Sequence, residues 1–350
     1  MAFDPKSSWL QCPAESHQNG KRCQEKAEIR FHPGHFGAEG DEALFLFPFP
    51  WLAIQRAARC RARRINFVKG TILTMLAELF AVAANGVNYG VYDFAETMGD
   101  RPLAIEETYI NQRTAKGWAN ATGERSLYDL CTSFKSKGRM PLVTIEPRYS
   151  GDVLQKVATG KCDAELGTIA AHLRAYGGPA IIRWGHEAEN PIYPWGGKSP
   201  GKYIAAYRYV VSYLRNHLVT QKLYFCWSPI GNTNCVAYYP GDDCVNFVGC
   251  SLFWTRALAR MYHTTDGSFR SLFSEKYATL AQFHKPIIIA ECGVSVSEDQ
   301  TSWIAGMRQS VGAFPLLHTI VYFNAQDGYA WVNRTKPDWR LRDSDLWGSR

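Results

Sequence analysis

The stretch PAIIRWGHE, residues 179–187, decides the fold because an apolar run passes directly into a cluster of charged residues. Its first four residues are apolar, and Arg183, His186 and Glu187 follow within five positions. Charged side chains rarely follow a buried strand so closely unless they form ion pairs or take part in binding or catalysis. The stretch therefore predicts an interior strand whose carboxyl end carries functional groups.

Seven further apolar runs resemble this one, and the eight predicted strands cover residues 87–94, 102–110, 140–147, 179–187, 222–229, 244–253, 285–293 and 318–326. Amphipathic segments with apolar residues at i, i+3 and i+4 lie between several of them, at residues 127–137, 164–176, 202–216, 271–283 and 301–314. This alternation indicates parallel βαβ units. Eight units within residues 87–350 predict a single (β/α)8 TIM barrel, an α/β fold. A doubly wound open sheet is the alternative, but no GxGxxG loop follows the first strand.

The segment before the barrel has a different character. Residues 1–63 lack sustained periodicity and are expected to be a disordered or non-native extension. Residues 64–86 combine a basic flank, an apolar stretch from Ile72 to Ala84 and small residues, which is typical of a signal peptide. We expect cleavage near Ala83 or Ala84, a true start near Val68 or Met75, and a secreted or periplasmic protein. The alternative is a buried helix that precedes the domain. The apolar stretch is too short to span a membrane.

Composition narrows the possible partners and cofactors. The net charge is +7, and no basic run is long enough to suggest nucleic acid binding. No HExxH motif is formed because Asn190 occupies its last position, and no Cys/His metal spacing occurs, so we expect no metal and no cofactor. Cys235 and Cys244 either form a disulfide or remain free and buried. We expect a monomer.

Two glutamates lie at the carboxyl ends of predicted strands, where (β/α)8 barrels carry their catalytic residues. Glu187 ends the fourth predicted strand and Glu291 ends the seventh, which is a separation of three βα units of about 35 residues each. Glycoside hydrolysis uses two carboxyl groups that face each other in a cleft. One is an ionised nucleophile, and the other has a raised pKa and acts first as an acid and then as a base. Two structural carboxylates paired with arginines are the alternative. Arg183 shares strand parity with Glu187 and is expected to point inward, towards Glu146 or Glu291.

Three motifs resemble glycoside hydrolase family 26, whose best-known members are β-mannanases. They are RWGHEAENPIYPWG (183–196), YYPGDDCVNFVG (238–249) and IIIAECG (287–293). The resemblance implies a (β/α)8 barrel with Glu187 as proton donor and acid/base and Glu291 as nucleophile. It implies a retaining mechanism with the two carboxyl groups ~5–5.5 Å apart. It also gives His186 a sugar-binding or nucleophile-positioning role.

The expected substrate-binding residues are aromatic or charged groups near strand ends, because sugar rings stack on aromatic faces. They are His186, Tyr193, Trp195, Trp227, Phe253, Trp254, Trp331, Glu146 and Arg183, with Trp195 and Trp227 the first choices. Phe253 stands where many family members have a tyrosine that hydrogen-bonds the nucleophile, so either Trp254 or another group supplies that contact or the nucleophile is tuned differently. Glu189 replaces a common amide and is expected to be a rim residue.

These features predict a secreted retaining endo-glycosidase that hydrolyses a β-linked polysaccharide. β-1,4-Mannan or a related bacterial exopolysaccharide is the default substrate, and mixed-linkage glucan and β-1,3-xylan are the rivals. A catalytically silent carbohydrate-binding barrel is the alternative from a different class. A structural barrel without a ligand is disfavoured because tryptophans and carboxylates gather at the strand ends.

Overall fold

The computed structural model describes residues 86–118 and 123–348. The expected extension at 1–63 and nearly all of the signal-peptide-like segment at 64–86 lie outside the described residues, so those predictions stay predictions.

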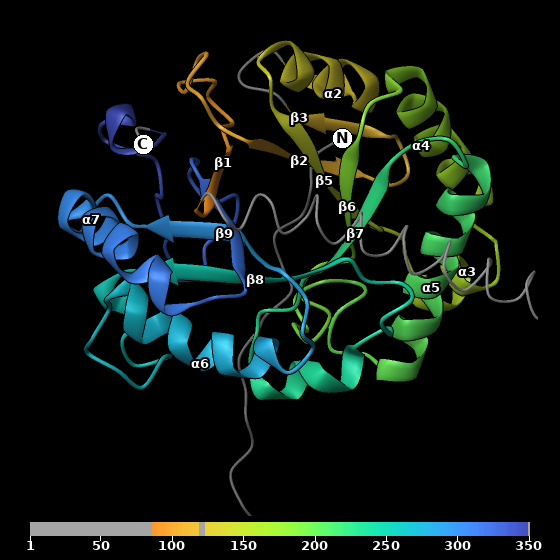
Figure 1. Cartoon of the computed structure of the whole chain (residues 1–350). Coiled ribbons are helices and arrows are strands. Elements are labelled where there is room, and N and C mark those ends of the chain that lie inside the picture. The colour runs from red at the N-terminus through yellow and green to blue at the C-terminus, as the bar shows by residue number, and fades with distance from the viewer. Residues whose placement is uncertain (1–85, 119–122, 349–350) are drawn as a thin grey trace, which may run out of the picture. The chain divides into compact units, whose positions relative to one another are not determined.

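Eight parallel strands close into a barrel, as the sequence predicted (Figure 1). Each strand pairs with the next along the chain, and the last pairs with the first. The barrel strands are β1 (Asn88–Tyr92), β2 (Ile105–Asn111), β5 (Met140–Glu146), β6 (Ala180–Trp184), β7 (Leu223–Trp227), β8 (Phe247–Trp254), β9 (Ile287–Val294) and β10 (Leu317–Phe323). Closure leaves the barrel itself without an unpaired edge and brings all eight carboxyl ends to one rim.

The five predicted helices are all present, and their bounds agree with the predicted segments to within a few residues. They are α2 (Leu127–Ser136), α4 (Asp163–Tyr176), α5 (Pro200–His217), α6 (Phe269–Ala281) and α7 (Gln300–Ser310). Local chemistry sets where they begin. The side chains of Ser126, Ser268 and Asp299 each accept a backbone N–H of the first turn of α2, α6 and α7. Proline in the first turn starts α5, and α4 ends at Gly177 with a left-handed backbone.

Several short elements were not predicted. An antiparallel hairpin of β3 (Lys116–Trp118) and β4 (Glu124–Ser126) adds to β2. A short helix, α3 (Val153–Ala158), follows β5, and among the described residues 3-10 turns form η2 (Thr233–Tyr238), η3 (Arg256–Leu258), η4 (Val311–Ala313) and η5 (Ser344–Leu346). Elements of three to six residues are too short to show a period in the sequence, which is why the pattern missed them.

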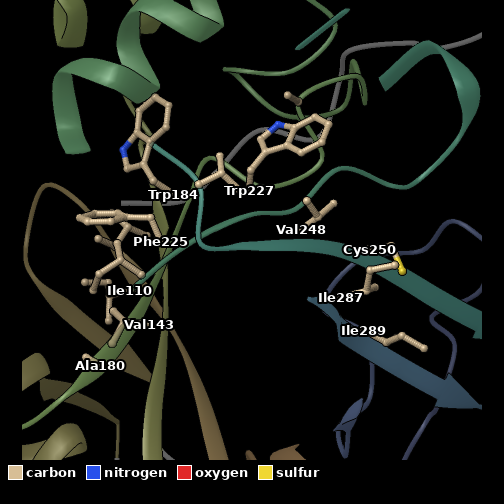
Figure 2. Close-up of a cluster of buried hydrophobic side chains, with 14 of the residues drawn as sticks. Ile110, Val143, Ala180, Trp184, Phe225, Trp227, Val248, Cys250, Ile287 and Ile289 are labelled. Atoms are coloured by element: carbon tan, nitrogen blue, oxygen red, sulfur yellow. The ribbon is translucent and has the colours of Figure 1, made fainter. Parts of the chain in front are cut away.

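Two apolar layers hold the barrel together. The inner layer fills its amino-terminal half and consists mainly of Ile105, Leu142, Ile181, Cys226, Phe247, Ile288, Ala290 and Val321. The larger outer layer lies between the strands and the helices, and Figure 2 shows part of it. Side chains of a strand alternate between these layers. The carboxyl-terminal half of the barrel interior, beyond the inner apolar layer, can therefore hold polar side chains.

The cysteines belong to these layers. All seven cysteines of the described part are free and buried, including Cys235 and Cys244. The two alternatives for this pair therefore resolve to free thiols in this structure. No helix among the described residues is long and apolar enough to cross a membrane.

Candidate active site

An arginine lies at the centre of the barrel interior, just above the inner apolar layer. Arg183 on β6 is fully buried, and its Nη2 donates to Glu291 Oε1 on β9 at 2.7 Å. Its Nη1 donates to Glu107 Oε1 at 3.2 Å and to Thr144 Oγ1 at 3.3 Å. The expectation that Arg183 points inward and meets an acidic side chain agrees with this geometry. Glu291 is the partner that the sequence proposed, and Glu107 is one that it missed.

A bulge in β9 aims Glu291 into the barrel. The pairing with β8 passes from Cys250–Ile289 to Ser251–Glu291 and skips Ala290. Ala290 belongs to the inner apolar layer and the adjacent Glu291 reaches Arg183, so two consecutive residues face inward. Bulges commonly re-aim a side chain in this way next to active sites.

Glu187 follows β6 in a strained backbone conformation. Its φ is +49°, which is unusual for a residue other than glycine. Its N–H donates to Ser228 O at 2.7 Å, and its Oε2 accepts from Asn190 Nδ2 at 2.9 Å. Backbone strain of this kind persists only where the surroundings fix it, and it gathers at active sites. The contacts with Ser228 and Asn190 supply that fixing here.

The charges of neighbouring groups act on the Glu291 carboxyl group. Burial raises the pKa of Glu291 to about 7, the charge of Arg183 acts against this rise, and the negative charge of Glu187 adds to it. Burial also raises the pKa of Glu107, to about 8, again opposed by Arg183. The raised pKa values of this cluster belong to the carboxyl groups of Glu291 and Glu107. One guanidinium cannot neutralise two buried carboxylates, so this cluster keeps a proton near neutral pH.

His186 lies beside this cluster as a buried and neutral imidazole. Burial, together with the positive charges of Arg183 and Arg148, holds the pKa of His186 well below its ordinary value. The ring packs edge-on against Tyr193 at 4.7 Å, Trp195 at 5.5 Å and Tyr109 at 5.9 Å. Its Nδ1 has no hydrogen-bond partner within the described chain.

Trp195 supports the site instead of offering a face to a sugar. Its side chain is 0% exposed, and its indole N–H donates to His186 O at 2.7 Å. Tyr193 stacks on the ring at 4.7 Å, and Arg148 lies 5.7 Å from the ring centre. The prediction that Trp195 stacks on substrate is therefore wrong for this structure, because its own neighbours occupy its surroundings. Tyr193 is only partly buried and keeps some exposed surface.

The structure also contradicts the prediction that Trp227 binds substrate. The ring is 0% exposed and packs against Tyr239 at 5.1 Å and Phe283 at 5.2 Å. Cys226 faces the barrel interior, so the alternation of β7 turns Trp227 outward into the layer between strands and helices (Figure 2). The predicted role of Trp227 in sugar binding is wrong because the ring points away from the barrel axis.

The last two residues of β8, Phe253 and Trp254, lie on opposite faces of the strand. Phe253 faces inward, where its ring meets Trp339 at 4.8 Å and Phe323 at 5.8 Å. Trp254 is nearly buried in the outer layer and stacks on Tyr262 at 6.5 Å. The predictions that Trp254 binds substrate and that it replaces the missing tyrosine hydroxyl are therefore wrong.

Glu146 and Trp331 lie around the mouth of the barrel, near the rim to which the strand ends converge. Glu146 ends β5 and forms a bidentate pair with Arg148 at 2.7 and 2.8 Å. Trp331 is partly buried in the loop after β10, and its indole N–H donates to Asp327 Oδ2 at 2.8 Å. Large exposed apolar side chains also occur in loops that follow four of the barrel strands, namely Phe94, Ile192, Met261 and Tyr329.

Sequence reasoning missed or misplaced three buried residues. Glu107 and Tyr109 both face inward from β2, and the charges of Glu107 and Glu291 act on the Tyr109 hydroxyl. Two adjacent glutamates within the predicted strand at residues 102–110 were the available signal for Glu107. Glu189 is buried, not at the rim, and its Oε1 accepts the N–H groups of Ile230 and Gly231 at 2.7 and 3.3 Å.

Comparison with known proteins agrees with this arrangement. Residues 150–297, which include Glu187 and Glu291, match the model of glycosyl hydrolase family 26. Over this stretch the chain resembles that family.

The similar proteins are distant, and the curated relatives are longer than this chain. Endoglucanase H of Acetivibrio thermocellus is 27% identical over 73% of this chain, and a β-1,3-xylanase of a Vibrio species is 23% identical over 47%. The chain spans 27% and 35% of the length of these curated relatives. A modular endo-β-1,4-mannanase from Cellulomonas fimi has a TM-score of 0.57 at 20% identity, covering 71% of this chain and 67% of the other. A family 26 β-mannanase from Bacteroides ovatus has a TM-score of 0.56 at 16% identity, covering 72% and 85%. These structures share the barrel fold.

Proposed function

We propose that this protein is a retaining endo-glycosidase that hydrolyses a β-linked polysaccharide, with Glu291 as nucleophile and Glu187 as acid/base. The observation that carries the proposal is the inward Glu291 carboxylate, which Arg183 holds at 2.7 Å while the charge of Glu187 acts on it. The match of residues 150–297 to the family 26 model and the curated relatives named as an endoglucanase and a β-1,3-xylanase support the same reaction.

The proposed reaction has two steps. Glu291 attacks the anomeric carbon, the bond to the leaving oxygen breaks, and the Glu187 carboxylic acid gives that oxygen its proton. The product is a glycosyl ester of Glu291. Glu187, now a carboxylate, takes a proton from a water molecule, whose oxygen attacks the anomeric carbon and releases Glu291. Arg183 orients the Glu291 carboxylate and stabilises its ionised form before the attack.

The substrate part of the proposal has two candidates. β-1,4-Mannan is the default, because the family resemblance first pointed to β-mannanases. A β-glucan or β-1,3-xylan is the second candidate, because the curated relatives are named as an endoglucanase and β-1,3-xylanases. His186, Tyr193, Phe253, Trp331 and Glu146 are proposed to contact the sugar. Secretion or export to the periplasm is also proposed, supported by the signal-like segment at 64–86.

The decisive experiment measures reducing-sugar release from mannan, glucomannan, mixed-linkage glucan, β-1,3-xylan and bacterial exopolysaccharide. We expect one class of polymer to be cleaved, with initial products that keep the β configuration by NMR. Glu187→Ala is expected to lower kcat by ~10²–10⁴-fold, and Glu291→Ala to abolish turnover.

Azide separates the two roles. With a substrate that has a good leaving group, Glu187→Ala is expected to yield a β-glycosyl azide and Glu291→Ala an α-glycosyl azide. Binding that both variants preserve, without turnover of any polymer by the wild type, would instead establish a silent carbohydrate-binding barrel. An initial α-product would overturn the retaining mechanism.

A further inference from the structure

Three ionisable groups form a closed cluster inside the barrel. The side chains of Arg183 and Glu107 are 0% exposed and that of Glu291 is 10% exposed. Arg183 bridges the two carboxyl groups, with the shorter contact to Glu291 at 2.7 Å and the longer to Glu107 at 3.2 Å. Thr144 Oγ1 donates to the same Glu107 oxygen, Oε1, at 2.6 Å.

The two oxygens of Glu107 are in different surroundings. Oε1 receives donors from Thr144 and Arg183, whereas Oε2 is buried and has no hydrogen-bond partner among the residues that the structure describes. A buried carboxylate oxygen without a donor is costly, and a cluster of one cation and two anions carries uncompensated charge in a medium of low polarity. A proton on Oε2 removes the net charge of the cluster.

We propose that Glu107 is a positioning residue that stays protonated and thereby leaves Arg183 as the counter-ion of Glu291 alone. The inference rests on the proposed role of Glu291 as nucleophile and adds a residue that acts on it through Arg183. A neutral Glu107 still accepts from Thr144 and Arg183 through Oε1, so it fixes the orientation of the guanidinium without competing for its charge.

The other titratable groups that face Glu107 are neutral near pH 7 and do not compete for its proton. Tyr92 on β1, Tyr109 on β2 and Cys226 on β7 all have a pKa raised by burial, so they are neutral near pH 7. The competition is therefore between Glu107 and Glu291. Glu107 is the more deeply buried of the two, its contact to Arg183 is the longer, at 3.2 Å against 2.7 Å, and its Oε2 has no donor among the described residues. The proton accordingly favours Glu107.

The test compares Glu107→Gln, Glu107→Leu and the matched control Glu106→Gln. Glu106 is the preceding residue of β2, but it is ion-paired with Arg139 at 2.6 Å and lies outside the cluster. The first measurement is infrared absorption at pH 7, which needs no turnover. We expect the wild type and Glu106→Gln to show the same carbonyl absorption of buried carboxylic acids, and Glu107→Gln to lose the part that Glu107 contributes while Glu189 keeps its own. A spectrum of Glu107→Gln with the full absorption would overturn the proposal.

The second measurement is the acid limb of kcat/KM against pH, which reports the ionisation of the free enzyme. Because the amide of Glu107→Gln replaces a carboxyl group that is already neutral, this variant is expected to lower kcat only several-fold and to leave the midpoint of the acid limb in place. A midpoint that moves down by about one pH unit would show that Glu107 is ionised in the wild type and would overturn the proposal.

Glu107→Leu removes the acceptor of Thr144 and Arg183. We expect kcat to fall by on the order of 10–100-fold with little change in KM, because the guanidinium is no longer held. Glu106→Gln is expected to keep the wild-type kcat. If no polymer is turned over at all, the proposed function fails, and the infrared result still decides the charge of Glu107.

Discussion

Trp227 and Trp331 both lie near the carboxyl-terminal side of a barrel strand, yet only Trp331 keeps part of its ring exposed. The sequence does not separate them, because β7 is apolar on both faces and shows no polar alternation. The side of the strand on which Trp227 lies follows from its register with β6 and β8. A tryptophan near a strand end is therefore a weak guide to a sugar site.

Substitution of these two residues is expected to separate stability from binding. Trp227→Ala removes a buried ring and is expected to lower the free energy of unfolding by ~3–5 kcal/mol, with polysaccharide affinity unchanged. Trp331→Ala is expected to weaken affinity up to about tenfold through lost stacking, with little effect on stability. Denaturant unfolding and affinity electrophoresis measure the two quantities. Weaker binding by a fully stable Trp227→Ala protein would contradict the outward placement.

At the scale of elements, the segment after β7 holds the segment after β6. Glu187 donates its N–H to Ser228 O, while Glu189 accepts the N–H groups of Ile230 and Gly231. Lys276 on α6 reaches the same loop and donates to Ile230 O at 2.7 Å. The strained backbone of Glu187 is thus hydrogen-bonded to the loop after β7, and that loop is held by Glu189 and by Lys276.

Removal of the Glu189 acceptor is expected to disturb catalysis more than binding. Glu189→Ala frees two buried N–H groups and loosens the loop that orients Glu187, so we expect kcat to fall by about 10–100-fold with a small change in KM. Glu189→Gln retains an acceptor oxygen and is expected to keep most of the activity. Steady-state kinetics on the cleaved polymer test this, with the exposed Glu275→Ala on α6 as control. Equal losses in Glu189→Gln and Glu189→Ala would argue against an acceptor role.

At the scale of the whole molecule, buried carboxyl groups make stability depend on pH. The pKa values of Glu107, Glu189 and Glu291 are raised to about 8, 7 and 7, mainly by burial. A raised carboxyl pKa means that the folded state binds more protons than the unfolded state, so the stability from these groups is lost as pH rises through the folded pKa. Buried His186 and His318 have lowered pKa values and act in the opposite direction, but only below about pH 6.5.

The free energy of unfolding is therefore expected to fall between about pH 6.5 and 8, by on the order of 2 kcal/mol. Urea unfolding at a series of pH values measures it. Glu107→Gln and Glu189→Gln each remove one titrating group and are expected to flatten the curve in this window. A stability that rises from pH 6.5 to 8 would show that these carboxyl groups are not held protonated in the folded state.

The sequence by itself determined the eight strands, the five main helices, the barrel and the assignment of Glu187 and Glu291 to the fourth and seventh strands, although Glu187 follows β6 and Glu291 lies within β9. Those features depend on local apolar periodicity and on the order of elements along the chain, which are both visible in the residues. The tertiary structure alone decided which side chains face inward, because the barrel strands are buried on both faces and carry no alternation. It also decided the bulge that aims Glu291 and the sharing of Arg183 with Glu107, since both depend on pairing between strands far apart in the chain.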